Sequence, residues 1–314
     1  MIVHLGLGAF HRAHQAVYTQ DAGDWTICGV AWRRRTVVDA LRCNTWRYDV
    51  ISRGPDGDDE RTIDVIREAL VAAEEPEAVI ERIASPDTHI VTLTITESGY
   101  ERGGILELLV AGIEARTTPL TVISCDNVPR NGEVLRDVLD APENVAFPCS
   151  MVDRIVPTPI EPLTVVAEPF SQWVLEDFEG PRPTWPGVQI VEDTAPFELM
   201  KLRLLNGSHT ALAALGMPKG YTTVAQAIAD PELEAFVRRL IAEELLPTIP
   251  PVPDTDLDEY VETMLARFRN PRIEHRLDKI AAGAEDKIAQ RLRPAAAELD
   301  DPVLIPRVIA AAGF

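Results

Sequence analysis

Residues 197–216 constrain the fold most, because they predict a helix that is buried on nearly every side. The stretch contains no proline and is rich in leucine and alanine, which are good helix formers. At about 100° per residue from Lys201, polar side chains share less than half of the circumference: Glu198 near 60°, His209 near 80° and Asn206 near 140°. On the opposite arc only Arg203 favours solvent. A core helix with an internal polar seam is therefore predicted.

The polar seam has two explanations. Buried polar and ionisable groups destabilise a fold unless they have partners. The first explanation is structural, with Lys201 pairing to Glu198 three residues before it on the same helix. The second is catalytic, with Lys201 accepting a proton while Asn206 and His209 hold a substrate. The seam alone does not decide between them.

The length and charge of the chain limit its class. A chain of 314 residues is too long for one ordinary core, so two domains are expected. A formal net charge of −20 opposes binding to nucleic acids and to anionic membranes. No window is apolar enough for a membrane span, and the first residues show no basic leader. The four cysteines lack metal or disulfide spacing and read as reduced thiols, so we expect a cytoplasmic protein.

The first residues predict a dinucleotide site. Residues 2–14 read as an apolar strand, a glycine turn and the start of a helix. In such a site Gly6 permits the tight turn and Gly8 lets the backbone approach a pyrophosphate. The third glycine of the GxGxxG pattern is absent, and His11 stands in its place. His11 and His14 are also spaced as a metal pair, but no third ligand is evident nearby, so we predict no metal site.

A second strand is expected at 25–32, and its end bears on the choice of cofactor. A Rossmann unit usually has an acidic residue there, which binds the ribose hydroxyls of NAD. This chain has Arg33 followed by two further arginines. They form either a solvated loop or a site that tolerates the 2′-phosphate of NADP. Both interpretations stay open.

Further strands alternate with helices, which predicts a parallel sheet. Strand-like runs are expected from 89 and from 120, helices at 76–84 and 131–139, and a polar turn-rich loop at 54–62. Ligands of such sheets bind at the carboxyl ends of the strands. Gly6, Glu97 and Asn127 all fall at such ends.

A proline- and glycine-rich interruption at 179–187 precedes a change of pattern. Beyond it helices are expected at 195–215, 223–230, 231–246, 255–268 and 274–292. Asp254 is placed to cap the helix that follows it. We therefore predict an α/β fold with a Rossmann-type NAD(P)-binding domain at 1–194 and a mainly α-helical domain at 195–314, which would bind substrate and carry the catalytic residues.

Five segments carry rare motifs in order along the chain: Gly6-Leu-Gly-Ala-Phe-His-Arg-Ala-His-Gln15, Thr94-Ile-Thr-Glu-Ser-Gly-Tyr100, Ser124-Cys-Asp-Asn-Val-Pro129, Met151-Val-Asp-Arg-Ile-Val-Pro157 and Lys201-Leu-Arg-Leu-Leu-Asn-Gly-Ser-His209. Together they resemble the mannitol dehydrogenase family of long-chain polyol and hexuronate oxidoreductases. Asn270-Pro271 and Lys287 add weaker support. The resemblance extends to about Pro294 and implies hydride transfer to or from NAD(P) without a metal ion.

The resemblance implies a role for each residue of the polar seam. Lys201 would be the general acid/base, and Glu198 would lie on a proton path beside it. Asn127 and Asn206 would polarise the reacting oxygen, because two amide donors stabilise a developing alkoxide without zinc. His209 would bind substrate. A lysine can act as a base near neutral pH where burial and nearby positive charge lower its pKa.

The resemblance also assigns binding residues. The expected cofactor contacts are Gly6, Gly8, Ala9, Phe10, Arg33, Glu97, Asn127 and Asp153. The expected substrate contacts are Asn127, Lys201, Asn206, His209 and Lys287. The sequence departs from the family where a lysine is expected at Ser98 and a Gly-Ser pair before Lys287. It also reads as a shortened member, whose helical domain would cover the cleft less completely.

We expect an oxidoreductase that uses NAD, with NADP as an alternative, to interconvert a polyol such as mannitol or arabinitol with its 2-ketose. A second hypothesis is a hexuronate reductase acting on fructuronate or tagaturonate, with Arg272, Arg276 or Lys287 as the partner of the substrate carboxylate. A third, favoured by the shortened tail, is a non-catalytic dinucleotide-binding protein. Monomer and dimer both stay open.

Overall fold

The computed structural model describes residues 1–100, 103–140, 142–159 and 161–314, and the side chains of Glu97 and Ser98 lie outside this description. The chain forms two compact units. The first comprises Met1–Arg53 with Gly57–Thr194, and the second comprises Gly54–Asp56 with Ala195–Phe314. Among the described residues, no helix has both the length and the apolar character that crossing a bilayer requires.

The first unit is built on a parallel sheet of six strands. Its order is β5-β2-β1-β6-β7-β8, with bounds β1 (Ile2–Leu5), β2 (Ile27–Ala31), β5 (Ile66–Val71), β6 (Ile90–Leu93), β7 (Leu120–Ser124) and β8 (Val145–Ala146). Every neighbouring pair in this sheet is parallel. The order is that of the doubly wound Rossmann fold, in which the strand order reverses beside the first strand. The predicted α/β class is confirmed.

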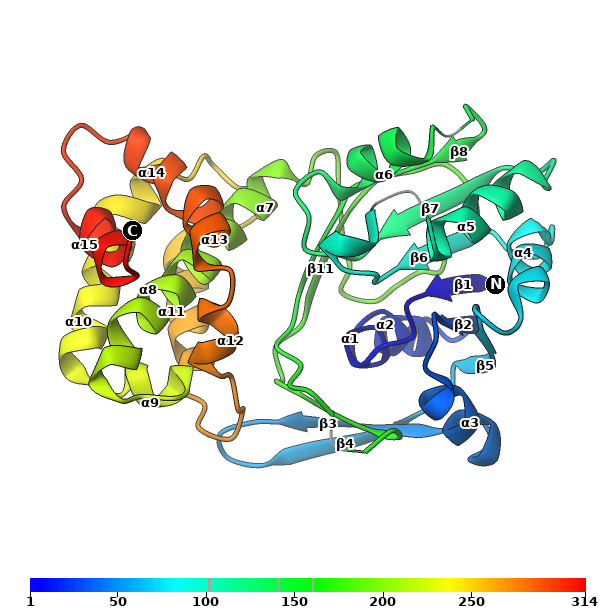
Figure 1. Cartoon of the computed structure of the whole chain (residues 1–314), viewed down its shortest axis with the longest axis horizontal. Helices are drawn as coiled ribbons and strands as arrows, with labels where there is room; N and C mark the ends of the chain where they lie inside the picture. The colour runs from blue at the N-terminus through cyan, green and yellow to red at the C-terminus, as the bar shows by residue number, and fades with distance from the viewer. Residues whose placement is uncertain (101–102, 141, 160) are drawn as a thin grey trace. The chain divides into compact units, whose positions relative to one another are not determined.

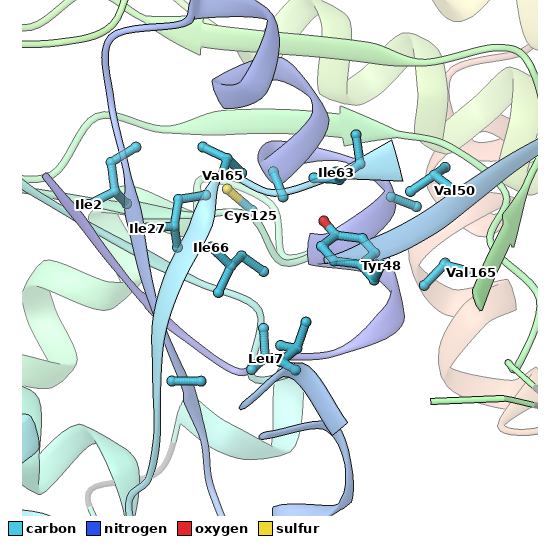
Figure 2. Packing of buried hydrophobic residues seen from close by; sticks show 14 of the residues in the cluster. Ile2, Leu7, Ile27, Tyr48, Val50, Ile63, Val65, Ile66, Cys125 and Val165 are labelled. Carbon is cyan, nitrogen blue, oxygen red and sulfur yellow. The ribbon is translucent and has the colours of Figure 1, made fainter. Parts of the chain in front are cut away.

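Helices cover both faces of this sheet, because successive side chains of a strand point to opposite faces. In β1, Val3 and Leu5 pack into one core and Ile2 into the other. The first core is covered by α4 (Pro76–Ala84), α5 (Ile105–Glu114) and α6 (Asn131–Leu139), seen in cyan and green in Figure 1. The second is covered by α1 (Ala9–Ala13), α2 (Gln15–Ala22) and α3 (Arg35–Cys43), and Figure 2 shows part of it. Packing on both sides of β1 fixes the turn that follows this strand.

Two three-stranded sheets complete the first unit. Their orders are β10-β3-β4 and β12-β11-β9, with bounds β3 (Tyr48–Arg53), β4 (Asp58–Ile63), β9 (Ser150–Asp153), β10 (Thr164–Ala167), β11 (Gln172–Glu176) and β12 (Gln189–Val191). The loop expected at 54–62 is wrong from residue 58 onward, because β4 pairs antiparallel with β3. Most of β4 is exposed and charged, so its composition resembles a loop while its ladder hydrogen bonds make it a strand.

The second unit is helical, as predicted. Its central helix consists of α7 (Ala195–Met200), a π-helical segment, η2 (Lys201–Asn206), and α8 (Gly207–Gly216). The remaining helices are η3 (Met217–Lys219), α9 (Val224–Ile228), α10 (Pro231–Leu240), the π-helical η4 (Ile241–Leu245), η5 (Leu246–Thr248), α11 (Leu257–Phe268), α12 (Leu277–Ala281), α13 (Ala284–Arg291), α14 (Arg293–Ala297) and α15 (Leu304–Ala311). Since α9, α10, α12, α13 and α15 all pack against α8, that helix is the core of the unit.

Two local expectations in this unit are wrong. The single helix expected at 274–292 is divided into α12 and α13, because Gly283 between them has a left-handed φ of +66°. The helix α11 is capped by Asp256 rather than by Asp254. The Asp256 carboxylate accepts hydrogen bonds from the backbone N–H groups of Asp258 and Glu259.

Arg203 is buried, whereas the sequence pattern placed it toward solvent. Its guanidinium forms a two-pronged ion pair with the carboxylate of Glu298 and donates to the carbonyl oxygen of Thr248. The side chain of Arg203 is 5% exposed and that of Glu298 is 51% exposed. A carboxylate from a distant part of the chain therefore supplies the partner that burial of this cation requires.

Candidate active site

The turn after β1 has the geometry of a phosphate-binding glycine loop. Gly6 has a φ of +104°, and a Cβ on it would lie 2.1 Å from the carbonyl oxygen of Thr94. Gly8 is exposed and ends the turn at the start of α1. Among the described residues, a Cβ on Gly8 would meet only the carbonyl oxygen of Gly6, at 3.6 Å. Gly6 is thus required by the fold itself, whereas the missing side chain of Gly8 leaves open space above the backbone. Ala9 and Phe10 follow in the first turn of α1 and are partly exposed.

A buried histidine supports this turn. Nε2 of His4 lies 2.9 Å from Oγ1 of Thr94 and 3.1 Å from the carbonyl oxygen of Gly6, and its Nδ1 lies 2.7 Å from Oγ1 of Thr92. The ring of His11, which replaces the third glycine, stacks on the ring of His4. Burial lowers the pKa of His4 to about 3 and that of His11 well below its usual value. Both imidazoles are therefore neutral at physiological pH.

The loops after β6 and β7 are joined by one carboxylate. Asp126 is buried, and its side chain accepts hydrogen bonds from the backbone N–H groups of Ile95 (3.0 Å) and Thr96 (2.8 Å). Asn127 follows it and is exposed at the carboxyl edge of the sheet. Glu97 lies in the 3₁₀ turn η1 (Glu97–Tyr100), but its side chain is outside the described part of the chain. This edge holds most of the predicted cofactor contacts.

Of the two remaining predicted cofactor contacts, Arg33 lies at this sheet edge and Asp153 does not. Arg33 is exposed just beyond the carboxyl end of β2, and its guanidinium carbon lies 5.4 Å from the ring centroid of Trp32. It therefore belongs to the same sheet edge as Gly6. Asp153 is buried at the end of β9, in a separate sheet.

The catalytic residues predicted from the seam all lie on the central helix of the second unit. Lys201 is the first residue of the π segment and is 9% exposed. Glu198, in α7, and Asn206, at the end of the π segment, are partly exposed. His209, in α8, is 5% exposed. An amino group and an imidazole are thus largely withdrawn from water on one helix.

The π segment narrows the arc that these side chains occupy. A π turn closes on the fifth residue rather than the fourth, so one additional residue is wound into it and the side chains beyond are set back by about 100°. Asn206 then moves from about 140° to about 40° relative to Lys201, and His209 moves from about 80° to about −20°. Such π segments are frequent at functional sites. The angles expected from the sequence were wider because they were derived for an ideal α-helix.

His209 sits in an aromatic and basic environment. Its ring centroid lies 4.5 Å from that of Phe268 and 4.5 Å from that of His275. Burial, followed by the charges of His275, Arg267 and Arg291, lowers the pKa of His209 well below its usual value. Among the described residues, Nε2 of His209 has no hydrogen-bond partner although it is buried. Because an unsatisfied buried polar atom is costly, this nitrogen is a natural contact for a bound hydroxyl group.

The other basic candidates are engaged elsewhere. Lys287 lies on α13, which packs against the π segment. Its Nζ donates to the carbonyl oxygens of Lys279, Ile280 and Ala282 at the end of α12. Arg276 is exposed and pairs with Asp278 and Glu274. Nη1 of Arg272 donates to the carbonyl oxygen of Gly54. A substrate contact by Lys287 would have to replace one of its three carbonyl contacts.

The histidines spaced as a metal pair are used for packing. His11 stacks on His4, and Nε2 of His14 lies 2.9 Å from the carbonyl oxygen of Gln172. No cluster of three or more His, Cys, Asp or Glu side chains in the described part of the chain could hold a metal ion.

Sequence reasoning missed three supporting residues. His4, Asp126 and His275 position the glycine turn, the loop after β6 and the ring of His209, respectively. His4 stands just before the motif Gly6–Gln15 and Asp126 lies within the motif Ser124–Pro129, so the motifs themselves were an available signal. His275 had no such signal, because its contact with His209 joins residues 66 positions apart through the fold.

Comparison with known proteins agrees with the two-domain fold. Two family models match: the mannitol dehydrogenase Rossmann domain over residues 1–187 and the mannitol dehydrogenase C-terminal domain over residues 193–311. Mannitol dehydrogenase 2 of Saccharomyces cerevisiae is 35% identical over 93% of this chain and 72% of the relative. The Pseudomonas fluorescens mannitol 2-dehydrogenase, solved with NAD and D-mannitol, is 34% identical with a TM-score of 0.89, over 99% of this chain and 78% of that one. A substrate-free D-sorbitol dehydrogenase is 29% identical with a TM-score of 0.89, over 99% and 79%.

Proposed function

Because the chain belongs to the mannitol dehydrogenase family of oxidoreductases, we propose that it interconverts a polyol, such as mannitol or arabinitol, with its 2-ketose by using NAD. The observation that carries this proposal is the central helix of the second unit. There Lys201 and Asn206 lie in a π segment on the same helix as His209, whose buried Nε2 lacks a partner among the described residues. A hydroxylated substrate would supply that partner.

The residues of the first unit fit a dinucleotide. The Gly6–Gly8 turn has open space where a side chain at Gly8 would stand, and it lies where the strand order of the sheet reverses. Gly6, Gly8, Ala9 and Phe10 would hold the pyrophosphate, and Asn127, Glu97 and Asp153 would contact the nicotinamide half. The bound nicotinamide supplies the hydride acceptor or donor. The structure of a relative with NAD supports this choice of cofactor.

In the proposed reaction the side chains of this chain handle the proton and the charge on oxygen. Lys201 would remove the proton of the reacting hydroxyl during oxidation and return it during reduction, with Glu198 passing protons to and from solvent. Asn206 and Asn127 would donate hydrogen bonds to the oxygen as negative charge develops on it. His209, neutral at physiological pH, would bind a neighbouring hydroxyl. These donors stabilise an alkoxide without a metal ion, so activity should persist in EDTA.

The test is a spectrophotometric screen of purified protein. Polyols would be oxidised with NAD, and 2-ketoses and hexuronates reduced with NADH, with EDTA present throughout. Turnover of a polyol and its ketose supports the proposal. Binding of NADH, followed by fluorescence, without turnover across the panel would overturn it in favour of a non-catalytic dinucleotide-binding protein.

One observation favours a hexuronate as a second candidate substrate. Nη1 of Arg291 donates to Oγ1 of Thr210, which follows His209 in α8. The charges of Arg267 and Arg291 also contribute to lowering the pKa of His209, so positive potential lies beside this histidine. A carboxylate substrate would benefit from that potential. The ratio of kcat/KM for fructuronate to that for fructose separates the two. If Arg291→Ala lowers kcat/KM for fructuronate at least tenfold while fructose is little affected, the hexuronate is favoured.

A further inference from the structure

We infer that this chain accepts NADP(H) as well as NAD(H), and that the guanidinium of Arg33, held against the ring of Trp32, contacts the 2′-phosphate. The inference rests on the dinucleotide binding that the proposed function requires, but it concerns the adenosine ribose rather than the nicotinamide. It assigns a specificity role to residues at the end of β2, away from the proposed proton transfer.

The end of β2 is tied directly to the glycine turn. The carbonyl oxygen of Val30, in β2, accepts hydrogen bonds from the N–H groups of Gly6 (2.9 Å) and Leu7 (3.0 Å). In a Rossmann unit a dinucleotide whose pyrophosphate lies at this turn places its adenosine ribose at the end of the second strand. Here that strand ends at Ala31 and is followed by Trp32 and Arg33. The 2′ position of the ribose therefore faces a basic segment.

The ring of Trp32 gives Arg33 a fixed support. Trp32 is partly buried against the hydrophobic core, and a Cβ on Gly104 would lie 3.3 Å from the indole. The carbonyl oxygen of Trp32 also accepts a hydrogen bond from Ala73 N at 3.0 Å. Arg33 is exposed, and its guanidinium carbon is 5.4 Å from the indole centroid. A guanidinium held over an aromatic ring loses less freedom when its N–H edge binds a phosphate.

The nearby carboxylates do not oppose a phosphate. Asp39 and Glu74 both pair with Arg35, at 2.9 Å and 3.1 Å. Within the described part of the chain, neither Arg33 nor Arg34 is paired with a carboxylate. An acidic residue at the end of β2 would bind the ribose diol and repel a 2′-phosphate, but Arg33 occupies that place. The local charge thus favours the additional phosphate of NADP.

Two measurements test this assignment together. The first is kcat/KM with NADH and with NADPH for the wild type, Arg33→Ala and Arg33→Lys. The second is direct titration with 2′,5′-ADP and with 5′-ADP, which reports on the 2′-phosphate contact without turnover. Arg239→Ala is the matched control, because it removes one exposed arginine, paired with Glu243, from α10 of the other unit.

In the wild type we expect the two cofactors to differ by less than about tenfold in kcat/KM. Loss of a charge-assisted contact of about 1.5–3 kcal/mol lowers affinity about 10- to 100-fold. Arg33→Ala should therefore weaken the binding of NADPH and 2′,5′-ADP by about that factor. The affinities for NADH and 5′-ADP should stay within about twofold of the wild type. Arg33→Lys should fall between, since it keeps the charge and loses the fork.

The inference is overturned if Arg33→Ala changes the affinities for 2′,5′-ADP and 5′-ADP by the same factor. It is also overturned if the wild type binds NADH but not 2′,5′-ADP. An equal effect of Arg239→Ala would overturn it as well, because only net charge would then matter. Failure of the proposed function looks different. In that case no substrate turns over with either cofactor, while the 2′,5′-ADP titration still shows whether Arg33 recognises the 2′-phosphate.

Discussion

The rings of His4 and His11 are stacked face to face, with centroids 3.3 Å apart and planes 10° from parallel. Both rings are fully buried, and His4 contacts the carbonyl oxygen of Gly6 in the glycine turn. Two histidines in this arrangement must both stay neutral, because a proton on either would place an unsolvated charge against the other ring. The proposed cofactor turn is therefore supported by a pair that acid will disturb.

This pair predicts how stability depends on pH. The pKa of His11 is well below 6.5 in the folded state, chiefly through burial, so only the unfolded chain takes up its proton as the pH falls below 6.5. Stability from this group is present above pH 6.5 and is lost as the pH falls toward the folded pKa. Between pH 7 and pH 5 the loss is about 2 kcal/mol for one such histidine. Urea unfolding of the wild type and of His11→Phe at several pH values measures it.

We expect the free energy of unfolding of His11→Phe to fall less than that of the wild type over this range, by about 2 kcal/mol. Comparing slopes removes any constant difference in stability between the two proteins. Equal slopes would show that His11 takes up a proton in the folded state or does not determine the acid sensitivity.

Substitution by alanine should affect stability at Gly6 and cofactor binding at Gly8. In Gly6→Ala the Cβ meets the carbonyl oxygen of Thr94 at 2.1 Å with a φ of +104°, so the free energy of unfolding should fall by at least about 2 kcal/mol. In Gly8→Ala the φ of −105° is ordinary and the Cβ has space. That variant should fold within about 1 kcal/mol of the wild type and bind NADH at least about tenfold more weakly. Urea unfolding and NADH fluorescence check both, and normal NADH affinity in folded Gly8→Ala contradicts the assignment.

Substitution of His209 should weaken substrate binding and leave the affinity for the cofactor unchanged. His209→Ala should raise the KM for the best polyol at least about tenfold, while the Kd for NADH stays within about twofold, because the lost contact belongs to the substrate. His209→Asn keeps a donor and should recover part of the loss. His89→Ala, outside the second unit, serves as the control. If NADH affinity falls along with substrate affinity, the substitution has disturbed the structure rather than a substrate contact.

Much of the fold follows from local pattern. The helices Pro76–Ala84 and Asn131–Leu139 are present with the expected bounds, and the parallel sheet follows from the alternation of strands and helices. The strand Asp58–Ile63 was not predictable, because its exposed charged residues resemble a loop and only pairing with β3 makes it a strand. The break at Gly283 was missed, because an isolated glycine is tolerated in many helices.

The candidate site could be predicted as a set of residues but not as a geometry. The polar seam of the helix gave Lys201, Asn206 and His209 as candidates, and their functional roles stay predictions. Their angular spacing depends on the π segment, which no periodicity in the sequence indicates. The contact between His209 and His275 likewise depends on how α8 and the segment before α12 pack.

The central claim concerns Lys201, and Lys201→Ala tests it most directly. A general acid/base contributes about 10²–10⁴-fold, so kcat for the best polyol should fall by at least about a hundredfold while the Kd for NADH stays within about twofold. The matched control is Lys219→Ala, whose amine is paired with Asp230 and Glu232 on the surface of the same unit and should leave kcat unchanged. A kcat in Lys201→Ala equal to that of the wild type would contradict the account.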